Sequence, residues 1–376
     1  MKKYIIIALA AVVAFTACTK SNPEEKKAEQ ISFQVANYVP ATKANVSILP
    51  EVGEAGFNTM AYLRAAGSLD TYQKFFGVDG ENVKWDATKA EWAPVGGPYY
   101  WPKAEESVIN FFSWFSNNGA PAVVNSASET SMTWTNKKVA ETDNIMYADP
   151  AWHFKKNIKP ATYGSTLGNA AGAATEGVPT LFHHALSQIA LKAYLAKPAD
   201  DEDTQWEVKI SNAYFTKYYT TGTLALTATE PALTVTNTAQ AWDASSAAWT
   251  IAATAAKDGS YGKEAAVAIS AETKAAADEV LKAGSVLPQS ISGNAEAQLA
   301  FDLYIKTTYK NGASNEETVP VLLALKDFTE VATWAMNTRY TYIIKVLLGE
   351  NKIVFDPAVV EYLITDVEAE IAVNND

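Results

Sequence analysis

The chain has 376 residues, with 42 acidic and 30 basic side chains, and a formal net charge of −12 at pH 7. This surplus of negative charge repels phosphate backbones, so the composition argues against nucleic acid as a partner. Hydrophobic residues make up 48% of the sequence, which is enough to bury a sizeable core. Because the length exceeds what one core usually organises, we expect two domains.

Residues 1–17 have the pattern of an export signal. Lys2 and Lys3 precede an apolar run that ends before Ala17, and this run is shorter than the roughly 20 residues that a membrane span needs. Cys18, the one cysteine of the sequence, follows directly. A cysteine in this position is typical of bacterial lipoproteins, so we expect cleavage between Ala17 and Cys18, lipidation of Cys18 with acyl chains such as palmitate, and an outer-membrane anchor. The alternative is a plain signal peptide followed by an incidental cysteine.

Residues 18–30 are densely charged and predict a solvated, flexible tether. Folding is expected to begin with a strand in which Ile31, Phe33 and Val35 alternate with polar residues. The further strands predicted in this half cover residues 58–65, 108–116, 131–136 and 190–196. Residues 31–198 are therefore assigned to an N-terminal β-sandwich domain.

A run of acidic residues next to Pro198 marks the predicted domain boundary. The strands predicted after it cover residues 207–214, 223–227, 232–236, 247–252, 299–307, 318–325, 340–348 and 352–355. Helical patterns are sparse, and the best candidates are residues 270–283 and a turn around residues 184–189. Residues 204–376 are assigned to a C-terminal β-sandwich domain, so the expected fold is mainly β, with two sandwiches in tandem and few short helices.

The last predicted strand is the most regular of all. Val367, Ala369, Ile371 and Val373 are separated by single residues, most of them acidic, which predicts one apolar face and one acidic face. Such a strand needs a groove or a neighbouring strand to cover its apolar face. The sequence leaves two alternatives open, an internal edge strand or an arm that is available to another molecule.

Residues suited to catalysis or metal binding are scarce. The histidines are His153, His183 and His184, and the adjacent pair cannot both face one site on a regular strand. The acidic run at residues 200–203 lacks the spacing of a calcium loop. A pair of carboxylates distant in the chain, as in glycoside hydrolases, stays open as an alternative. We therefore expect no enzyme activity, no metal and no cofactor.

Several short sequence patterns occur in order along nearly the whole chain after the signal. They are Ile-Ser-Phe at 31–33 with Ala-Thr-Lys-Ala at 41–44, Tyr-Tyr-Trp-Pro at 99–102 before Ile-Asn-Phe-Phe-Ser at 109–113, Leu-Phe-His-His-Ala-Leu-Ser-Gln-Ile at 181–189, Val-Leu-Pro-Gln at 286–289, and Trp-Ala-Met-Asn-Thr-Arg-Tyr-Thr-Tyr at 334–342. Together with the lipoprotein signal, this combination resembles the fimbrillin-like family, the lipoprotein precursors of type V pilus subunits.

The resemblance implies two transthyretin-like sandwich domains and assembly at the cell surface by strand exchange. In that scheme a trypsin-like protease cuts after a basic residue that follows the first strand, and a strand of a neighbouring subunit fills the groove. Carried onto this chain, the removable strand covers residues 31–36, and the cut falls between Lys43 and Ala44. The alternative for Lys43 is an ordinary surface lysine. Arg64, the next arginine, lies inside a predicted strand and is expected to be protected.

The same resemblance suggests that Val367, Ala369, Ile371 and Val373 form the donor strand. The expected function is a structural fimbrial subunit that supports cell adhesion, with other pilus subunits, the outer membrane and host or bacterial surface ligands as partners. The rival hypothesis is a surface glycan-binding lipoprotein of a polysaccharide uptake system. The chain has ten tryptophans, and any that are exposed can stack on sugars.

Overall fold

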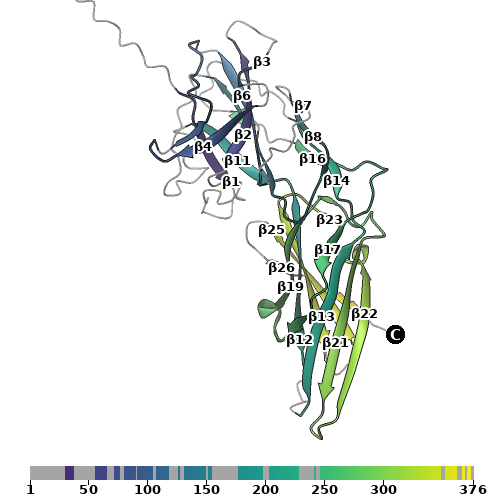
Figure 1. The fold of residues 1–376 in the computed structure, drawn as a ribbon. Coiled ribbons are helices and arrows are strands. Elements are labelled where there is room, and N and C mark those ends of the chain that lie inside the picture. The colour runs from purple at the N-terminus through teal and green to yellow at the C-terminus, as the bar shows by residue number, and fades with distance from the viewer. Residues whose placement is uncertain are drawn as a thin grey trace, which may run out of the picture.

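The computed structural model of the chain describes residues 30–37, 56–65, 72–76, 80–89, 91–104, 107–117, 126–127, 131–149, 151–154, 177–197, 203–227, 241–242, 246–348, 352–361, 366–368 and 371–373. Within these ranges the regular structure is almost entirely β, with two short 3₁₀ turns, η3 (Lys274–Ala276) and η4 (Leu325–Asp327). The expected mainly β fold is therefore confirmed. No helix of the described ranges is long and apolar enough to span a membrane. Early strands gather at one end of the molecule and late strands at the other (Figure 1).

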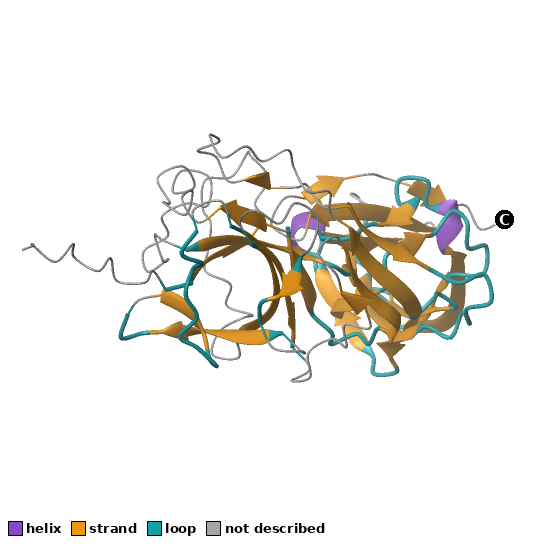
Figure 2. Cartoon of the chain, turned by 90° about the horizontal axis from the view of Figure 1, so that it is seen from above, coloured by secondary structure: helices purple, strands orange, loops and turns teal. Residues whose placement is uncertain are grey.

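Most of the early strands, together with one later strand, form one large sheet that closes on itself. Its order is β15 (Ala241–Trp242), β10 (Ala151–Phe154), β6 (Val108–Ser116), β9 (Ile145–Ala148), β11 (Val178–His184), β1 (Phe33–Asn37), β5 (Glu91–Pro94), β4 (Glu81–Asp86), β2 (Phe57–Arg64) and β3 (Gln73–Lys74). Because β6 also pairs with β2, the strands from β6 to β2 form a ring, which is seen end on in Figure 2. An aromatic-rich cluster that includes Phe33, Phe57 and Phe111 fills the ring.

Strand β6 is buried on both faces, and its sequence shows why. Residues 108–115 are apolar except for Asn110 and Ser113, and all of them are buried. Ile109 and Phe111 belong to the cluster inside the ring, whereas Phe112 and Trp114 belong to a second cluster outside it. Successive side chains of a strand point to opposite faces, so an apolar run of this length allows β6 to connect two cores.

The second cluster lies under a smaller sheet. This sheet has the order β16 (Ser246–Thr250), β14 (Thr221–Thr227), β8 (Ser131–Lys138) and β7 (Ser126–Ala127). Its Trp134 and Leu224 are buried together with Phe112 and Trp114 of β6. The rings of Trp114 and Trp134 meet edge to face, with centroids 6.4 Å apart. The small sheet therefore covers the outer side of the ring.

The late strands form a β-sandwich around the largest apolar cluster. One sheet contains β19 (Asp278–Val286), β12 (Ser187–Ala196), β24 (Thr338–Leu347), β25 (Lys352–Glu361), β26 (Asp366–Glu368) and β27 (Ile371–Val373). The other contains β17 (Ser260–Lys263), β18 (Val267–Ile269), β13 (Gln205–Thr216), β21 (Gln298–Thr308) and β22 (Ser314–Ala324). The core between them includes Phe215, Leu299 and Tyr342. A short pair, β20 (Gln289–Ser290) and β23 (Thr333–Trp334), lies apart from both sheets.

Most predicted strands coincide with observed ones. The prediction for residues 108–116 matches β6 residue for residue, and the predictions for 58–65, 299–307 and 340–348 match β2, β21 and β24 within a few residues. The strand predicted at 232–236 lies outside the described residues. Apolar patterns, either alternating or continuous, were therefore a reliable signal for strands in this chain.

Both predicted helices are wrong. Residues 270–283 contain only the turn η3 before β19 begins, and β19 pairs antiparallel with β12. Around residues 184–189, β11 ends at His184 and β12 begins at Ser187. The alanines of residues 270–283 favour a helix by less than about 1 kcal/mol each. Burial of Val280, Leu281 and Val286 in the sandwich core outweighs that preference.

Some strands on each side of the predicted boundary pack with the other half of the chain. Strand β12 precedes residue 198, yet it lies between β19 and β24 in the sandwich. Strands β14 and β16 follow residue 204, yet they join β8. Backbone bonds also cross the junction, since the amide of Ser285 donates to the carbonyl of Glu141 at 2.8 Å. The division into residues 31–198 and 204–376 stays a prediction.

Candidate functional site

The first strand is held on both sides by the backbone of the ring. Strand β1 runs parallel to β11 from Phe33 to Asn37, and the amide of Val178 donates to the carbonyl of Ser32 at 2.7 Å. On its other side, Phe33 pairs with Trp92 of β5, and the amide of Ile31 donates to the carbonyl of Tyr99 at 2.8 Å. We call the surface formed by β11, β5 and residues 99–100 the β1 groove.

The side chains of this segment divide between the two faces, as the alternation predicts. Ile31 and Phe33 are 0% exposed and Val35 is 5% exposed, whereas Ser32 is only half-buried. The ring of Phe33 lies 5.6 Å from that of Phe57 and 5.5 Å from that of Phe111, both edge to face. Burial of each of these apolar side chains contributes about 1.5–3 kcal/mol to stability, so β1 is a substantial part of the core.

No pairing joins β11 directly to β5 in the described sheet, because β1 lies between them. Departure of β1 would therefore leave two unpaired strand edges and uncover the aromatic cluster of the ring. A gap of this kind accepts an extended strand, which restores the main-chain hydrogen bonds and fills the pockets for alternate side chains. The geometry of the β1 groove is thus suited to exchange of one strand for another.

Gly177 brings β11 unusually close to β1. Its φ of +123° is in a region that L side chains rarely adopt, and an added Cβ would lie 2.7 Å from the carbonyl carbon and oxygen of Ser32. Glycine is needed here for its conformation and for the close approach of two backbones. Any strand that occupies the groove in the same way has to pass this glycine.

Glu81 holds the opposite border of the β1 groove. Its carboxylate accepts hydrogen bonds from the amide of Gly96 at 2.8 Å and from the hydroxyl of Tyr99 at 2.7 Å. The hydrogen bond to Glu81, together with burial, raises the pKa of Tyr99 above its usual range. These bonds fix the loop whose carbonyl at Tyr99 receives the amide of Ile31.

Several predicted site residues lie outside the described residues, namely Ala17, Cys18, Lys43, Ala44 and Ala369. Arg64 is the last residue of β2, and its guanidinium lies 5.2 Å from the centre of the Tyr72 ring. Of the predicted exchange site, the structure therefore describes the removable strand, as β1, and parts of the donor strand, as β26 and β27.

The C-terminal segment is paired as an edge strand of its own sandwich. Val367 lies opposite Val359 of β25, and Ile371 and Val373 lie opposite Phe355 and Ile353. Both short strands pair antiparallel with β25 in the same register. Of the two alternatives that the sequence leaves open, the structure contains the internal edge strand. Such a strand has one paired side and one open side.

The paired histidines have structural partners. The Nε2 of His183 lies 2.9 Å from a carboxylate oxygen of Asp149, and the Nδ1 of His184 lies 3.1 Å from the side-chain oxygen of Asn144. Burial, aided by His183 and Arg339, lowers the pKa of His184 to about 4. The backbone of His153 is in β10, and its side chain is outside the description. The described residues contain no cluster of three or more metal-ligating side chains.

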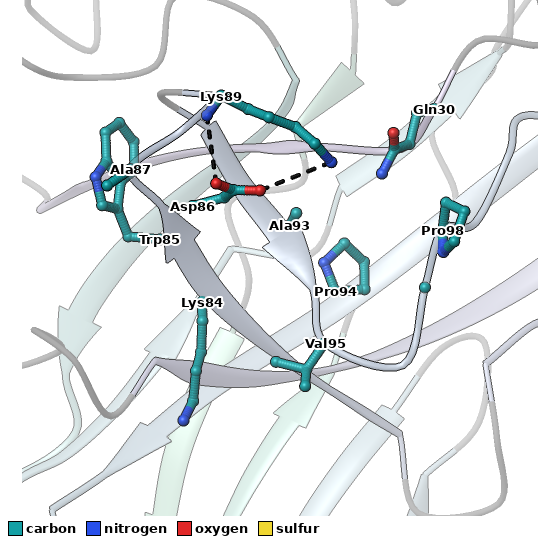
Figure 3. A pocket seen from close by; sticks show the side chains of 11 residues that line it. Gln30, Lys84, Trp85, Asp86, Ala87, Lys89, Ala93, Pro94, Val95 and Pro98 are labelled. Atoms are coloured by element: carbon teal, nitrogen blue, oxygen red, sulfur yellow. Dashed lines mark hydrogen bonds and ion pairs between the residues drawn. The ribbon is translucent and has the colours of Figure 1, made fainter.

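An open hollow of about 490 Å³ borders the β4–β5 hairpin (Figure 3). Its lining includes Gln30, Trp85 and Asp86. Trp85 is half-buried and packs against Trp92 with centroids 5.8 Å apart. Lys89 contacts the Asp86 carboxylate through its amide at 3.3 Å and through Nζ at 3.7 Å. The hollow thus combines an aromatic ring with hydrogen-bonding groups.

No protein-family model matches the sequence, and no curated protein matches it. Solved structures that this chain resembles include a fimbrial protein from Bacteroides vulgatus (15% identity, TM-score 0.49, 89% of this chain and 99% of that one covered). A candidate cell adhesion protein from Bacteroides uniformis (14%, 0.39, 89% and 98%) and a fimbrial assembly protein from Parabacteroides distasonis (8%, 0.33, 91% and 99%) are also similar.

Sequence reasoning found β1 but missed the groove that holds it. Gly177 and Tyr99 are distant from β1 in the chain, and parallel pairing with β11 leaves no local signal in either strand. The one available hint is that Gly177 directly precedes the strand β11. A glycine at a strand end is consistent with the close approach of another backbone, but it does not identify the strand that approaches.

The close approach at Gly177 can be tested with an alanine. We expect Gly177→Ala to lower the free energy of unfolding by at least about 1 kcal/mol more than Gly312→Ala does, measured by urea denaturation. Gly312 is a matched control, because its φ is also positive (+81°) while an added Cβ would meet nothing within 4 Å. Equal losses in the two variants would show that contact with Ser32 does not constrain this position.

His184 predicts a loss of stability in mild acid. Its folded pKa of about 4 lies below the usual value of 6.5, so the unfolded chain takes up a proton first as the pH falls. Stability should decline from about pH 6.5 down to about pH 4, by roughly 3 kcal/mol from this group. Denaturation of His184→Gln, which cannot be protonated, should give a flatter profile over this window, and an unchanged slope would contradict the assignment.

Proposed function

We propose that this chain is a structural subunit of a surface fimbria that assembles by exchange of its first strand and supports cell adhesion. The observation that carries the proposal is the position of β1. This strand lies near the start of the described chain and closes the ring between β11 and β5. A short strand that buries Ile31, Phe33 and Val35 yet ends shortly before Lys43 is suited to removal by one proteolytic cut.

The export route follows from the N-terminal sequence. We infer cleavage between Ala17 and Cys18, lipidation of Cys18 and delivery to the outer membrane, with residues 18–30 as the tether. In this proposal β1 occupies its groove during delivery and protects the apolar core. A trypsin-like cut between Lys43 and Ala44 would then separate the lipid and β1 from the body of the subunit.

The proposed donor is the C-terminal strand around Val367, Ala369, Ile371 and Val373. The pairing of its described parts with β25 supports an extended conformation, and its edge position requires the loss of only one strand partner when it leaves. In a neighbouring subunit it would form main-chain hydrogen bonds with the β1 groove. The proposed partners are therefore other pilus subunits, either identical or related, and the fimbria as a whole would contact host or bacterial surface ligands.

A surface glycan-binding lipoprotein is the second candidate. The observation that favours it is the open hollow bordered by Trp85 and Asp86, since a sugar ring can stack on an indole while its hydroxyls bind a carboxylate (Figure 3). A glycan binder would remain monomeric, keep its lipid and lose affinity when Trp85 is replaced. A fimbrial subunit would form polymers whether or not Trp85 is present.

The role of Lys43 is tested by comparing Lys43→Arg with Lys43→Gln in the full-length precursor. A trypsin-like protease needs a basic residue at this point, so we expect the Arg variant to be cut before Ala44 and the Gln variant to stay intact. N-terminal sequencing of surface material and electron microscopy measure the cut and the polymer together. Polymers whose subunits still begin at lipidated Cys18 would instead identify an anchor subunit that keeps β1.

The donor assignment is tested by truncation. Deletion of residues 366–376 should abolish polymerisation and leave a folded monomer, because β25 keeps its pairing with β24 over ten residues. Deletion of residues 374–376 alone is the matched control, since it leaves β26 and β27 intact. Electron microscopy and size-exclusion chromatography are the measurements. Normal polymers from the longer deletion would exclude this strand as the donor.

A further inference from the structure

The centre of the β1 groove accepts a large ring. Phe33 is 0% exposed, and its side chain is edge to face with both Phe57 and Phe111 at about the same centroid distance, 5.6 and 5.5 Å. Phe57 in turn contacts Phe182 of β11 at 5.3 Å and Trp92 of β5 at 5.8 Å. The ring of Phe33 therefore packs directly against two aromatic rings, one from β2 and one from β6, and Phe57 connects this pocket to the rings of Phe182 and Trp92.

The positions beside Phe33 are occupied by smaller side chains. Ile31 and Val35 are buried aliphatic residues, and Ser32 is half-buried beside Gly177. A strand that replaces β1 therefore needs three alternating apolar side chains with the largest in the middle. It also needs a backbone carbonyl at the position of Ser32 to accept from the amide of Val178, and a backbone amide at the position of Ile31 to reach the carbonyl of Tyr99.

The C-terminal strand of this chain meets these requirements only in part. Two alignments keep all three buried positions apolar, and they place either Ala369 or Ile371 at the position of Phe33. Both also put a glutamate, Glu368 or Glu370, at the half-buried position of Ser32. Replacing a buried Phe by a smaller residue leaves a cavity, and partial burial of a carboxylate adds a further cost.

We propose that the β1 groove selects a donor strand with an aromatic residue in the middle of three alternating apolar positions, and that its preferred donor belongs to a different subunit and not to a second copy of this chain. The inference rests on the proposed strand exchange and deepens it. The physical reason is the pocket that holds the aromatic ring of Phe33, because the C-terminal strand offers only Ala369 or Ile371 at this position and neither side chain fills it. Homotypic exchange would then be weak, and the chain would join an assembly with subunits of another sequence.

A peptide-competition experiment tests this inference on the full chain. A unique protease site is placed over residues 40–44, the chain is cut there, and β1 remains in its groove without a covalent link. Synthetic peptides of residues 29–38 and 365–374 then compete with a fluorescent copy of the first peptide. We expect the peptide of residues 365–374 to bind at least about 100-fold more weakly than that of residues 29–38.

Two variants separate the aromatic ring from other differences between the peptides. Phe33→Ala in the first peptide should weaken binding about 100-fold or more, whereas Ser32→Ala should change it by less than about threefold. Ile371→Phe in the second peptide should strengthen its binding at least about tenfold. Failure of Ile371→Phe to improve binding would overturn the selection for an aromatic residue.

The remaining outcomes distinguish the two proposals. Binding of the unmodified peptide of residues 365–374 within about threefold of the peptide of residues 29–38 would overturn the preference for a different subunit, while strand exchange itself would stand. Failure of every peptide to enter the groove, including the one with the sequence of β1, would overturn the proposed strand exchange.

Discussion

The insertion of β1 between β11 and β5 is the interaction on which the N-terminal half depends. It supplies the backbone partner for both neighbours and places Phe33 at the centre of the aromatic cluster. Because the ring closes through this strand, its apolar interior and its main-chain hydrogen bonds are completed by the same few residues. A fold arranged in this way is complete only while some strand occupies the β1 groove, and the proposed assembly rests on this requirement.

Strand β6, which is buried on both faces, connects the core around β1 to the core of the small sheet. Phe111 contacts Phe33 inside the ring, and its neighbour Phe112 packs outside the ring with the small sheet. The small sheet in turn contains β14 and β16, which follow β13 of the sandwich and the loop after it. The β1 groove is therefore connected to the small sheet through the two clusters that β6 joins, and β14 of the small sheet follows β13 of the sandwich within a few residues.

Local pattern predicted what depends on local chemistry. The alternation at Ile31, Phe33 and Val35 and the apolar residues of β6 identified strands, because the spacing of apolar residues along a strand reflects which of its faces are buried. The same approach failed at residues 270–283, where alanine favours a helix but pairing with β12 buries Val280 and Leu281 in a strand. Propensities below about 1 kcal/mol per residue cannot compete with such tertiary burial.

The sequence by itself determined the mainly β character and the two alternating strands near its ends, and it predicted the export signal before Cys18. Only the tertiary structure decided which strands are neighbours. The parallel pairing of β1 with β11, the close approach at Gly177 and the crossing of β12 into the sandwich join residues far apart in the chain. Backbone hydrogen bonds are chemically identical in every strand, so partner choice is set by the shape of the shared core, which no single segment encodes.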